Sequence, residues 1–113
     1  MHATQSPRFS TLADCDDIRR AIREHRLVEF YYTGELVTAE PYIHGVGPRY
    51  STTILLAWSA EQGWREYSLM RIRRFRVLDR CYEQTQPDYD PQDPRMKSVD
   101  TAAAVIGRTR QAG

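Results

Sequence analysis

Residues 28–32 read Val-Glu-Phe-Tyr-Tyr, and their pattern decides the fold class. Apolar side chains fall on every second position, which is the period of a strand with one buried face. Upstream, Ile18, Ala21 and Ile22 recur at helical spacing behind a run of N-cap candidates at residues 14–17. The sequence therefore predicts a short amphipathic helix over roughly residues 16–25 and a first strand directly after it.

Four more strand signals follow, separated by turn residues. Residues 37–43 alternate in polarity, although Pro41 confines this stretch to a sheet edge or a bulge. Residues 53–58 are apolar on both faces, as a central strand would be, and residues 64–72 and 75–77 complete the set. Short strands with tight turns behind one helix predict a mainly β fold, a small five-stranded barrel rather than a sandwich.

The two ends of the chain differ from this middle part. Residues 1–13 are polar and show no period, so we expect a flexible N-terminal arm. Residues 14–82 make up the one domain for which 113 residues leave room. Residues 83–113 form an acidic, proline-rich tail, and the stretch 99–106 within it, which contains three consecutive alanines, can form a short helix.

Composition excludes several classes of protein. No apolar run exceeds five residues, whereas a spanning helix needs about twenty, so we expect no membrane segment. Residues 1–7 lack the apolar stretch of a signal peptide. We therefore expect a cytoplasmic protein whose two cysteines, Cys15 and Cys81, are free thiols.

Charge is the strongest chemical signal, because the net charge of +1 hides an uneven distribution. Residues 61–82 carry six arginines against three carboxylates, and the tail that follows is acidic. Arginine presents a planar fork of donors that suits phosphate. If Phe75 points inward, Arg74 and Arg76 project together from the opposite face. The candidate ligand-binding residues are Arg49, Arg65, Arg71, Arg74, Arg76, His44, Tyr50 and Trp64.

Several explanations of these arginines stay open. Arginines that hold phosphates beside aromatic rings that stack on bases suit single-stranded nucleic acid, with Tyr50 or Trp64 as the stacking ring. Alternatively, the arginines form a solvated strand face that pairs with carboxylates, those of residues 88–93 in the tail included. The same basic strip and an unpaired strand edge can also meet an acidic protein partner or a second copy of the chain.

The remaining chemical groups give weaker signals. His44 precedes the glycine-rich stretch 45–48, which reads as a loop, and it can contact a phosphate there or be satisfied by the backbone. The three histidines are scattered, and the two cysteines lack the paired spacing of a metal site. We therefore expect no metal, no cofactor and no enzymatic activity.

Five short motifs occur in the order and spacing of a WYL domain. They are Ile18-x-x-Ala21-Ile22, Val28-x-Phe30-x-Tyr32, Glu40-Pro41, Leu55-Leu56-Ala57-Trp58 and Tyr67-Ser68-Leu69-Met70-Arg71-Ile72. Residues 16–82 thus resemble a WYL domain, of the kind found as short stand-alone bacterial proteins. The sequence departs from the family at the positions of its eponymous tryptophan and tyrosine, which hold Thr53 and Ile54 here.

The resemblance implies a compact Sm-like or SH3-like barrel with a leading helix. It also implies a regulatory sensor, often of transcription, that holds a nucleotide or single-stranded nucleic acid by basic and aromatic side chains. Arg71 matches the family arginine. Because no helix-turn-helix fits into the thirteen residues before the helix, we do not expect a self-contained transcription factor. Two hypotheses result, a sensor of an anionic ligand and a protein-interaction module, for which a homodimer is one form.

Overall fold

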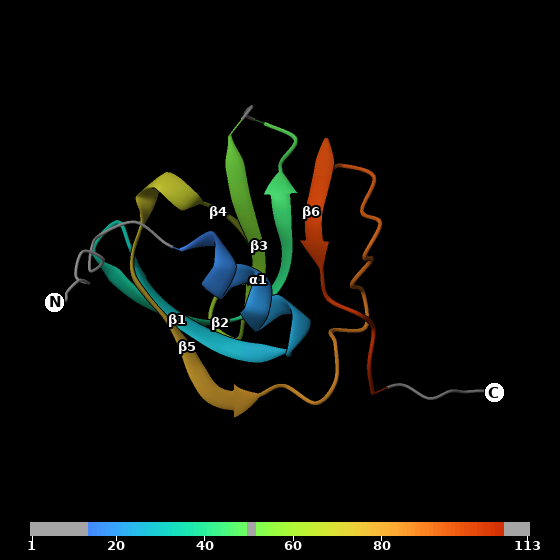
Figure 1. Cartoon of the computed structure of the whole chain (residues 1–113), viewed down its shortest axis with the longest axis horizontal. Coiled ribbons are helices and arrows are strands. Elements are labelled where there is room, and N and C mark those ends of the chain that lie inside the picture. Colours follow the sequence, from blue (N-terminus) through green and yellow to red (C-terminus); the bar gives the residue numbers. More distant parts are fainter. Residues whose placement is uncertain (1–13, 50–51, 108–113) are drawn as a thin grey trace, which may run out of the picture.

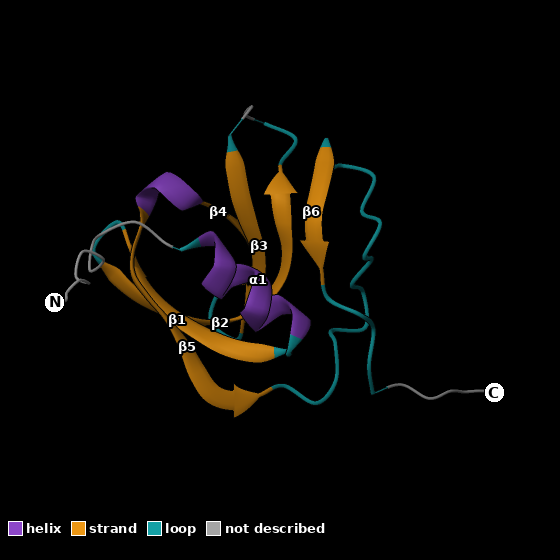
Figure 2. Cartoon of the chain, viewed as in Figure 1, coloured by secondary structure: helices purple, strands orange, loops and turns teal. Residues whose placement is uncertain are grey.

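A computed structural model describes residues 14–49 and 52–107 of the chain. This part contains the helix α1 (Cys15–Arg23) and six strands that form one antiparallel sheet (Figures 1 and 2). The strands are β1 (Arg26–Tyr32), β2 (Glu35–Val46), β3 (Thr53–Ser59), β4 (Gly63–Ser68), β5 (Ile72–Cys81) and β6 (Ser98–Ala102), and a short 3-10 helix, η2 (Leu69–Arg71), links β4 to β5. The prediction of a mainly β fold behind a leading helix is confirmed. The arm predicted for residues 1–13 lies outside the described residues.

Helix α1 begins where the sequence predicts its N-cap. The Asp14 carboxylate accepts a hydrogen bond from the Asp16 backbone N–H at 2.8 Å, which satisfies one of the free donors of the first turn. The three apolar positions predicted to face the core are fully buried. The helix ends at Arg23, slightly earlier than predicted, because His25 adopts a positive φ of 56° that no right-handed helix can contain.

Strands β1 and β2 form a tight hairpin. Thr33 and Gly34 have positive φ angles of 48° and 89°, which gives the two-residue turn that matches the twist of paired strands. Strand β2 then changes partners, since residues 35–39 pair with β1 and the rest of the strand pairs with β3. A register shift between Pro41 and Ile43 marks the change, so the bulge predicted at Pro41 is confirmed.

The strand order brings the two ends of the sheet together. The order is β4-β3-β2-β1-β5, and β6 pairs with β2 off this path. Strands β4 and β5 lie at opposite ends of the order, yet the three residues of η2 alone connect them. The sheet must therefore curl until its ends approach each other. Helix α1 lies across the curled sheet, and β1 and β5 run below it in the view of Figure 1.

The tail stretch for which a short helix was predicted forms a strand instead. Residues 98–102 form β6 and pair with residues 43–46 of β2. Strand β1 leaves this edge of β2 open, because it pairs only with residues 35–39. Pairing satisfies backbone groups that would otherwise be buried without partners, and this long-range gain outweighs the local helix preference of alanine.

Gly45 and Val46 also depart from the prediction, because they lie in β2 and not in a loop over residues 45–48. A Cβ atom on Gly45 would lie 2.2 Å from the Ser98 carbonyl oxygen. Glycine at this position therefore serves the close approach of β6 to β2 and not a phosphate-binding turn.

Aromatic rings attach the tail to the sheet. Tyr89 lies 4.5 Å from Tyr42 and 6.2 Å from Trp64, measured between ring centroids. The Tyr89 hydroxyl donates a hydrogen bond to the Ala103 carbonyl at 2.7 Å. Burial raises the pKa of Tyr42 and of Tyr89 above the usual range, so both hydroxyls stay protonated donors. The tail is thus part of the folded body.

The core lies between α1 and the concave side of the sheet. Its largest fully buried side chains include Phe30 and Tyr67, whereas Trp58 and Trp64 are only partly buried. Cys15 and Cys81 are both free. In the part of the chain that the structure describes, no helix is both long and apolar enough to cross a membrane.

Candidate anion-binding pocket

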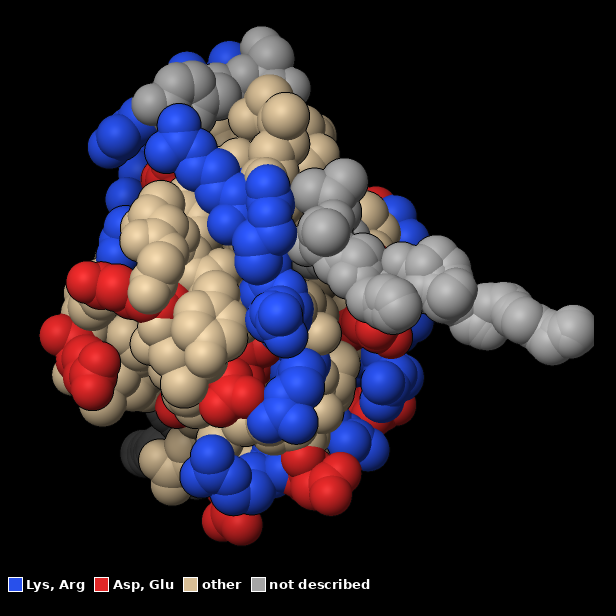
Figure 3. Space-filling model, turned by 90° about the vertical axis from the view of Figure 1, so that its left-hand side faces the viewer, with Lys and Arg blue, Asp and Glu red and all other residues tan. Residues whose placement is uncertain are grey.

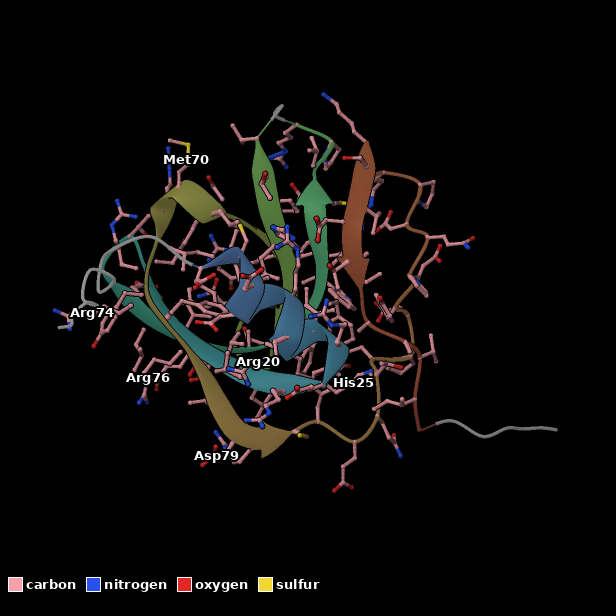
Figure 4. All side chains as sticks on the ribbon, viewed as in Figure 1. Arg20, His25, Met70, Arg74, Arg76 and Asp79 are labelled. Atoms are coloured by element: carbon pink, nitrogen blue, oxygen red, sulfur yellow. The ribbon has the colours of Figure 1, made fainter. Side chains whose placement is uncertain are left out.

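A pocket of about 750 Å³ lies where β3, β4 and η2 meet the tail. Its volume is in the range of small-molecule sites. We call it the arginine pocket, and Met70, labelled in Figure 4, lies on its rim. The lining residues are Tyr32, Arg49, Thr52, Ile54, Leu56, Trp64, Arg65, Glu66, Ser68, Met70, Arg71 and Arg95.

Four arginines from four separate segments converge on this pocket. Arg49 follows β2, Arg65 lies in β4, Arg71 ends η2 and Arg95 comes from the tail. Glu66 is the one carboxylate of the described lining, so the pocket carries an excess of positive charge. Of the nine ion pairs found among the described residues, one involves a pocket arginine, and that arginine is Arg95.

Arg65 is held in place by aromatic rings and not by a carboxylate. Its guanidinium carbon lies 5.1 Å from the centre of the Tyr67 ring and 5.7 Å from that of Tyr32. The side chain also donates to the side-chain oxygen of Gln62. Such cation–π contacts fix the direction of the guanidinium without neutralising its charge. Arg65 is therefore oriented and still able to bind an anion.

Arg95 brings the tail into the site, and the sequence analysis missed it. Its guanidinium donates to both oxygens of Asp93, at 2.7 and 3.1 Å. These hydrogen bonds, and more weakly the charge of Glu66, raise the pKa of Arg95. The sequence offered one signal, because Arg95 is the sole arginine in the acidic stretch 83–100.

Trp64 occupies one wall of the pocket, but its ring is partly used by the fold. Its indole N–H donates to the Asp88 carboxylate at 3.0 Å, and Tyr89 stacks on it. One alternative expected the acidic segment 88–93 to pair with the arginines of residues 61–82, but Asp88 and Asp93 form no ion pair with any of them in the described part of the chain. Their partners are Trp64 and Arg95, at the arginine pocket.

Arg74 and Arg76, which we call the β5 arginines, lie outside the arginine pocket. Both point away from the body of the molecule along β5 in Figure 4. Figure 3 shows that basic side chains form a ridge on this face. Arg76 pairs with Glu29 at 2.6 Å, whereas Arg74 sits in a β-bulge with a positive φ of 56°. The bulge breaks the simple alternation on which their common projection was predicted.

His44 is not a ligand contact of the arginine pocket, because it is buried with a relative exposure of 3%. Its Nδ1 lies 3.1 Å from the Asp100 carboxylate, which also accepts two hydrogen bonds from Arg19 and one from Thr101. These four residues, the Asp100 cluster, tie α1 to β2 and β6. The Arg19 hydrogen bonds above all hold the pKa of Asp100 well below its usual range.

The remaining predictions concern Tyr50 and a metal site. Tyr50 lies outside the described residues. No group of three or more histidine, cysteine or acidic side chains that could hold a metal occurs within residues 14–49 and 52–107. Of the eight candidate residues, the pocket gathers Arg49, Arg65, Arg71 and Trp64.

Comparison of the chain with protein-family models, with curated proteins and with solved structures finds no match.

Proposed function

We propose that the chain is a non-enzymatic binding module for a phosphate-bearing ligand, a nucleotide or a segment of single-stranded nucleic acid. The observation that carries the proposal is the convergence of four arginines on one pocket, three of them without an ion-pair partner among the described residues. Unpaired guanidinium groups around a concavity attract anions and donate in pairs to phosphate oxygens.

The rest of the lining suits such a ligand. Ile54 and Leu56 supply an apolar floor, and the exposed part of Trp64 supplies a planar wall. Hydroxyl groups of Thr52 and Ser68 add polar contacts. In our proposal Arg65 and Arg71 hold the phosphate, and the apolar floor receives the uncharged part of the ligand.

We further propose that the chain is a WYL-like regulatory module of the cytoplasm whose sheet is an Sm-like or SH3-like barrel. The strand order, the short η2 link between the end strands and the leading helix support this proposal. Arg71, which matches the family arginine, lines the pocket. The sequence departs from the family at Thr53 and Ile54, and Ile54 is in the pocket floor. This departure agrees with a ligand preference that differs from that of the family.

Isothermal titration calorimetry at low salt tests the proposal, with inorganic pyrophosphate and a short single-stranded DNA in separate arms. We expect saturable binding of at least one of them by the wild type. The double variant Arg65→Ala/Arg71→Ala should weaken it about tenfold or more, since each tenfold loss corresponds to about 1.4 kcal/mol of lost contacts.

The matched control is Arg74→Ala/Arg76→Ala, which removes the same charge from the face outside the pocket. We expect it to change the affinity less than about threefold, through long-range electrostatics alone. Absence of binding in both arms would contradict the proposal. Loss of binding in the control alone would move the site to β5.

A second candidate function rests on the face that carries the β5 arginines. Tyr31 and Leu36 are 42% and 51% exposed there, on neighbouring strands. Strand β5 pairs with β1 alone within the described residues, so its other edge is open. An acidic protein, or an acidic segment of a second copy, would suit this surface. Concentration-dependent sedimentation that Arg74→Ala/Arg76→Ala abolishes would support self-association.

A further inference from the structure

Glu66 is a carboxylate in a pocket otherwise lined by cations, and neither the fold nor the proposed phosphate binding uses it. Strand β4 pairs with β3 so that Glu66 lies opposite Leu56, and Ser68 lies opposite Ile54. Directly paired residues share one face of a sheet. Glu66 therefore stands over the apolar floor of the pocket.

One oxygen of the Glu66 side chain lies near Gly47, which directly follows β2. A Cβ atom added to the buried Gly47 would lie 3.6 Å from Glu66 Oε1 and 3.1 Å from Ile54 Cγ1. Glu66 Oε1 therefore lies near Gly47 and near the side chain of Ile54, and Glu66 is partly buried there.

This carboxylate lacks a partner in the described part of the chain. None of the nine ion pairs found there includes Glu66. Arg95, the cation that Glu66 influences, gives its hydrogen bonds to Asp93. No side-chain hydrogen bond to Glu66 is found among the described residues either, and the residue is only partly buried, so its oxygens are free to accept from N–H groups of a ligand.

The lining of the pocket therefore suits a ligand with three features. Arg65 and Arg71 suit an anion, Ile54 and Leu56 suit a flat apolar body, and Glu66 suits N–H donors. A carboxylate accepts best from two adjacent N–H groups that match its two oxygens. Among the common bases, guanine presents such a pair on its Watson–Crick edge. Adenine and cytosine present one amino group beside an acceptor nitrogen, and uracil presents one N–H between two carbonyl groups.

We propose that the arginine pocket selects a guanine nucleotide, with Glu66 accepting from the N1–H and the 2-amino group of the base. This inference rests on the proposed function, because it assigns the phosphate to Arg65 and Arg71. A pocket of about 750 Å³ is large enough for a nucleotide. Glu66 is then the residue that determines base specificity, and the arginines supply affinity for any phosphate.

Calorimetric titration with the four 5′-monophosphates GMP, AMP, CMP and UMP, and with inorganic pyrophosphate, tests the inference. We expect GMP to bind about tenfold or more tighter than AMP, because a site built for hydrogen bonds rejects a ligand that leaves them unmade. Glu66→Gln should bring GMP within about threefold of the other nucleotides, since its amide N–H₂ would face the donors of guanine. The affinity for pyrophosphate should stay the same or rise.

The control is Glu61→Gln, which removes the same charge from the turn between β3 and β4, outside the pocket lining. It should leave the preference for GMP intact. Equal binding of all four nucleotides and of pyrophosphate would overturn the guanine inference and leave the proposed function standing. An equal gain for all nucleotides in Glu66→Gln would also overturn it, because Glu66 would then act by charge alone. No binding of any nucleotide or of pyrophosphate would defeat the proposed function itself.

Discussion

The Asp100 cluster and the arginine pocket each combine arginine with one carboxylate, but they differ in how these charges are paired. In the Asp100 cluster the carboxylate accepts from Arg19, Thr101 and His44. In the arginine pocket Glu66 has no ion pair among the described residues, and Arg65 makes cation–π contacts with aromatic rings. Charges that hold elements together are paired within the chain. Charges that stay unpaired in a concavity are available to a ligand.

The difference also has a structural cause. The Asp100 cluster joins three elements that are far apart in the sequence, namely α1, β2 and β6. Each bond in it therefore contributes to the docking of β6. Arg49, Arg71 and Arg95 lie outside the strands, and Arg65 pairs with Ala57 through its backbone, so removal of these side chains leaves the strand pairing untouched. We expect the stability of the fold to depend on the Asp100 cluster and ligand binding to depend on the arginine pocket.

The largest expected effect on stability comes from Gly45→Ala, which disrupts the region of the Asp100 cluster without removing a charged side chain. The new Cβ would lie 2.2 Å from the Ser98 carbonyl oxygen, so β6 and Asp100 must move away from β2. We expect the free energy of unfolding to fall by about 3 kcal/mol, as for other substitutions that force an element apart. Urea denaturation followed by circular dichroism measures it.

Gly34→Ala is the matched control for that variant. Its Cβ would meet nothing within 4 Å, and the cost is confined to the φ angle of 89°. We expect a loss of about 1 kcal/mol. If Gly45→Ala and Gly34→Ala lost the same free energy of unfolding, the close approach of β6 to β2 would not limit stability.

Asp100→Asn should destabilise the protein less than Gly45→Ala, because the Asp100 side chain is 37% exposed and solvent screens its ion pairs. The amide can accept from one neighbour but cannot match both donors of Arg19. We expect a lower midpoint of urea denaturation and faster hydrogen exchange in β6. An unchanged midpoint would contradict the role assigned to the cluster.

The pH dependence of stability separates the two regions further. Hydrogen bonds from Arg19 lower the pKa of Asp100 from its ordinary value of 3.8, and Arg95 lowers that of Asp93. A depressed pKa in the folded state gives stability that is full above the ordinary value and is lost as the pH falls below it. Denaturation at pH 6, 5, 4 and 3 should show a decline below about pH 4. Asp100→Asn should show a shallower decline, and an identical profile would exclude Asp100 as its source.

The smallest expected effect on stability belongs to Arg49→Ala/Arg71→Ala in the pocket. Both side chains are exposed and have no ion pair among the described residues. We expect the free energy of unfolding to change by less than about 0.5 kcal/mol, while the affinity for pyrophosphate falls about tenfold. A large loss of stability would mean that the pocket arginines serve the fold, and the contrast between the two regions would disappear.

Sequence reasoning succeeded where the signal is local. The N-cap and the helix behind it were predicted and are present, and of the sheet edge or bulge expected at Pro41 the structure has the bulge. Each depends on the backbone preference of one residue or on a repeat within a few positions.

It failed where the outcome depends on a distant partner. The alanine-containing stretch forms β6 because it pairs with the open edge of β2. His44 belongs to the Asp100 cluster because this pairing places Asp100 beside it. The β5 arginines were grouped with Arg71 by proximity in sequence, but the curl of the sheet and the bulge at Arg74 separate them from the pocket.

The sequence by itself therefore determined a mainly β chain with a leading helix, and an excess of arginine in residues 61–82. Only the tertiary structure decided which arginines meet, that Arg95 joins them from the tail, and that Glu66 lies beside them with no ion pair among the described residues. The reason is physical. Periodicity and backbone preferences act over a few residues, whereas the pocket is assembled from segments up to 63 residues apart, from Tyr32 to Arg95, by strand pairing and the docking of the tail.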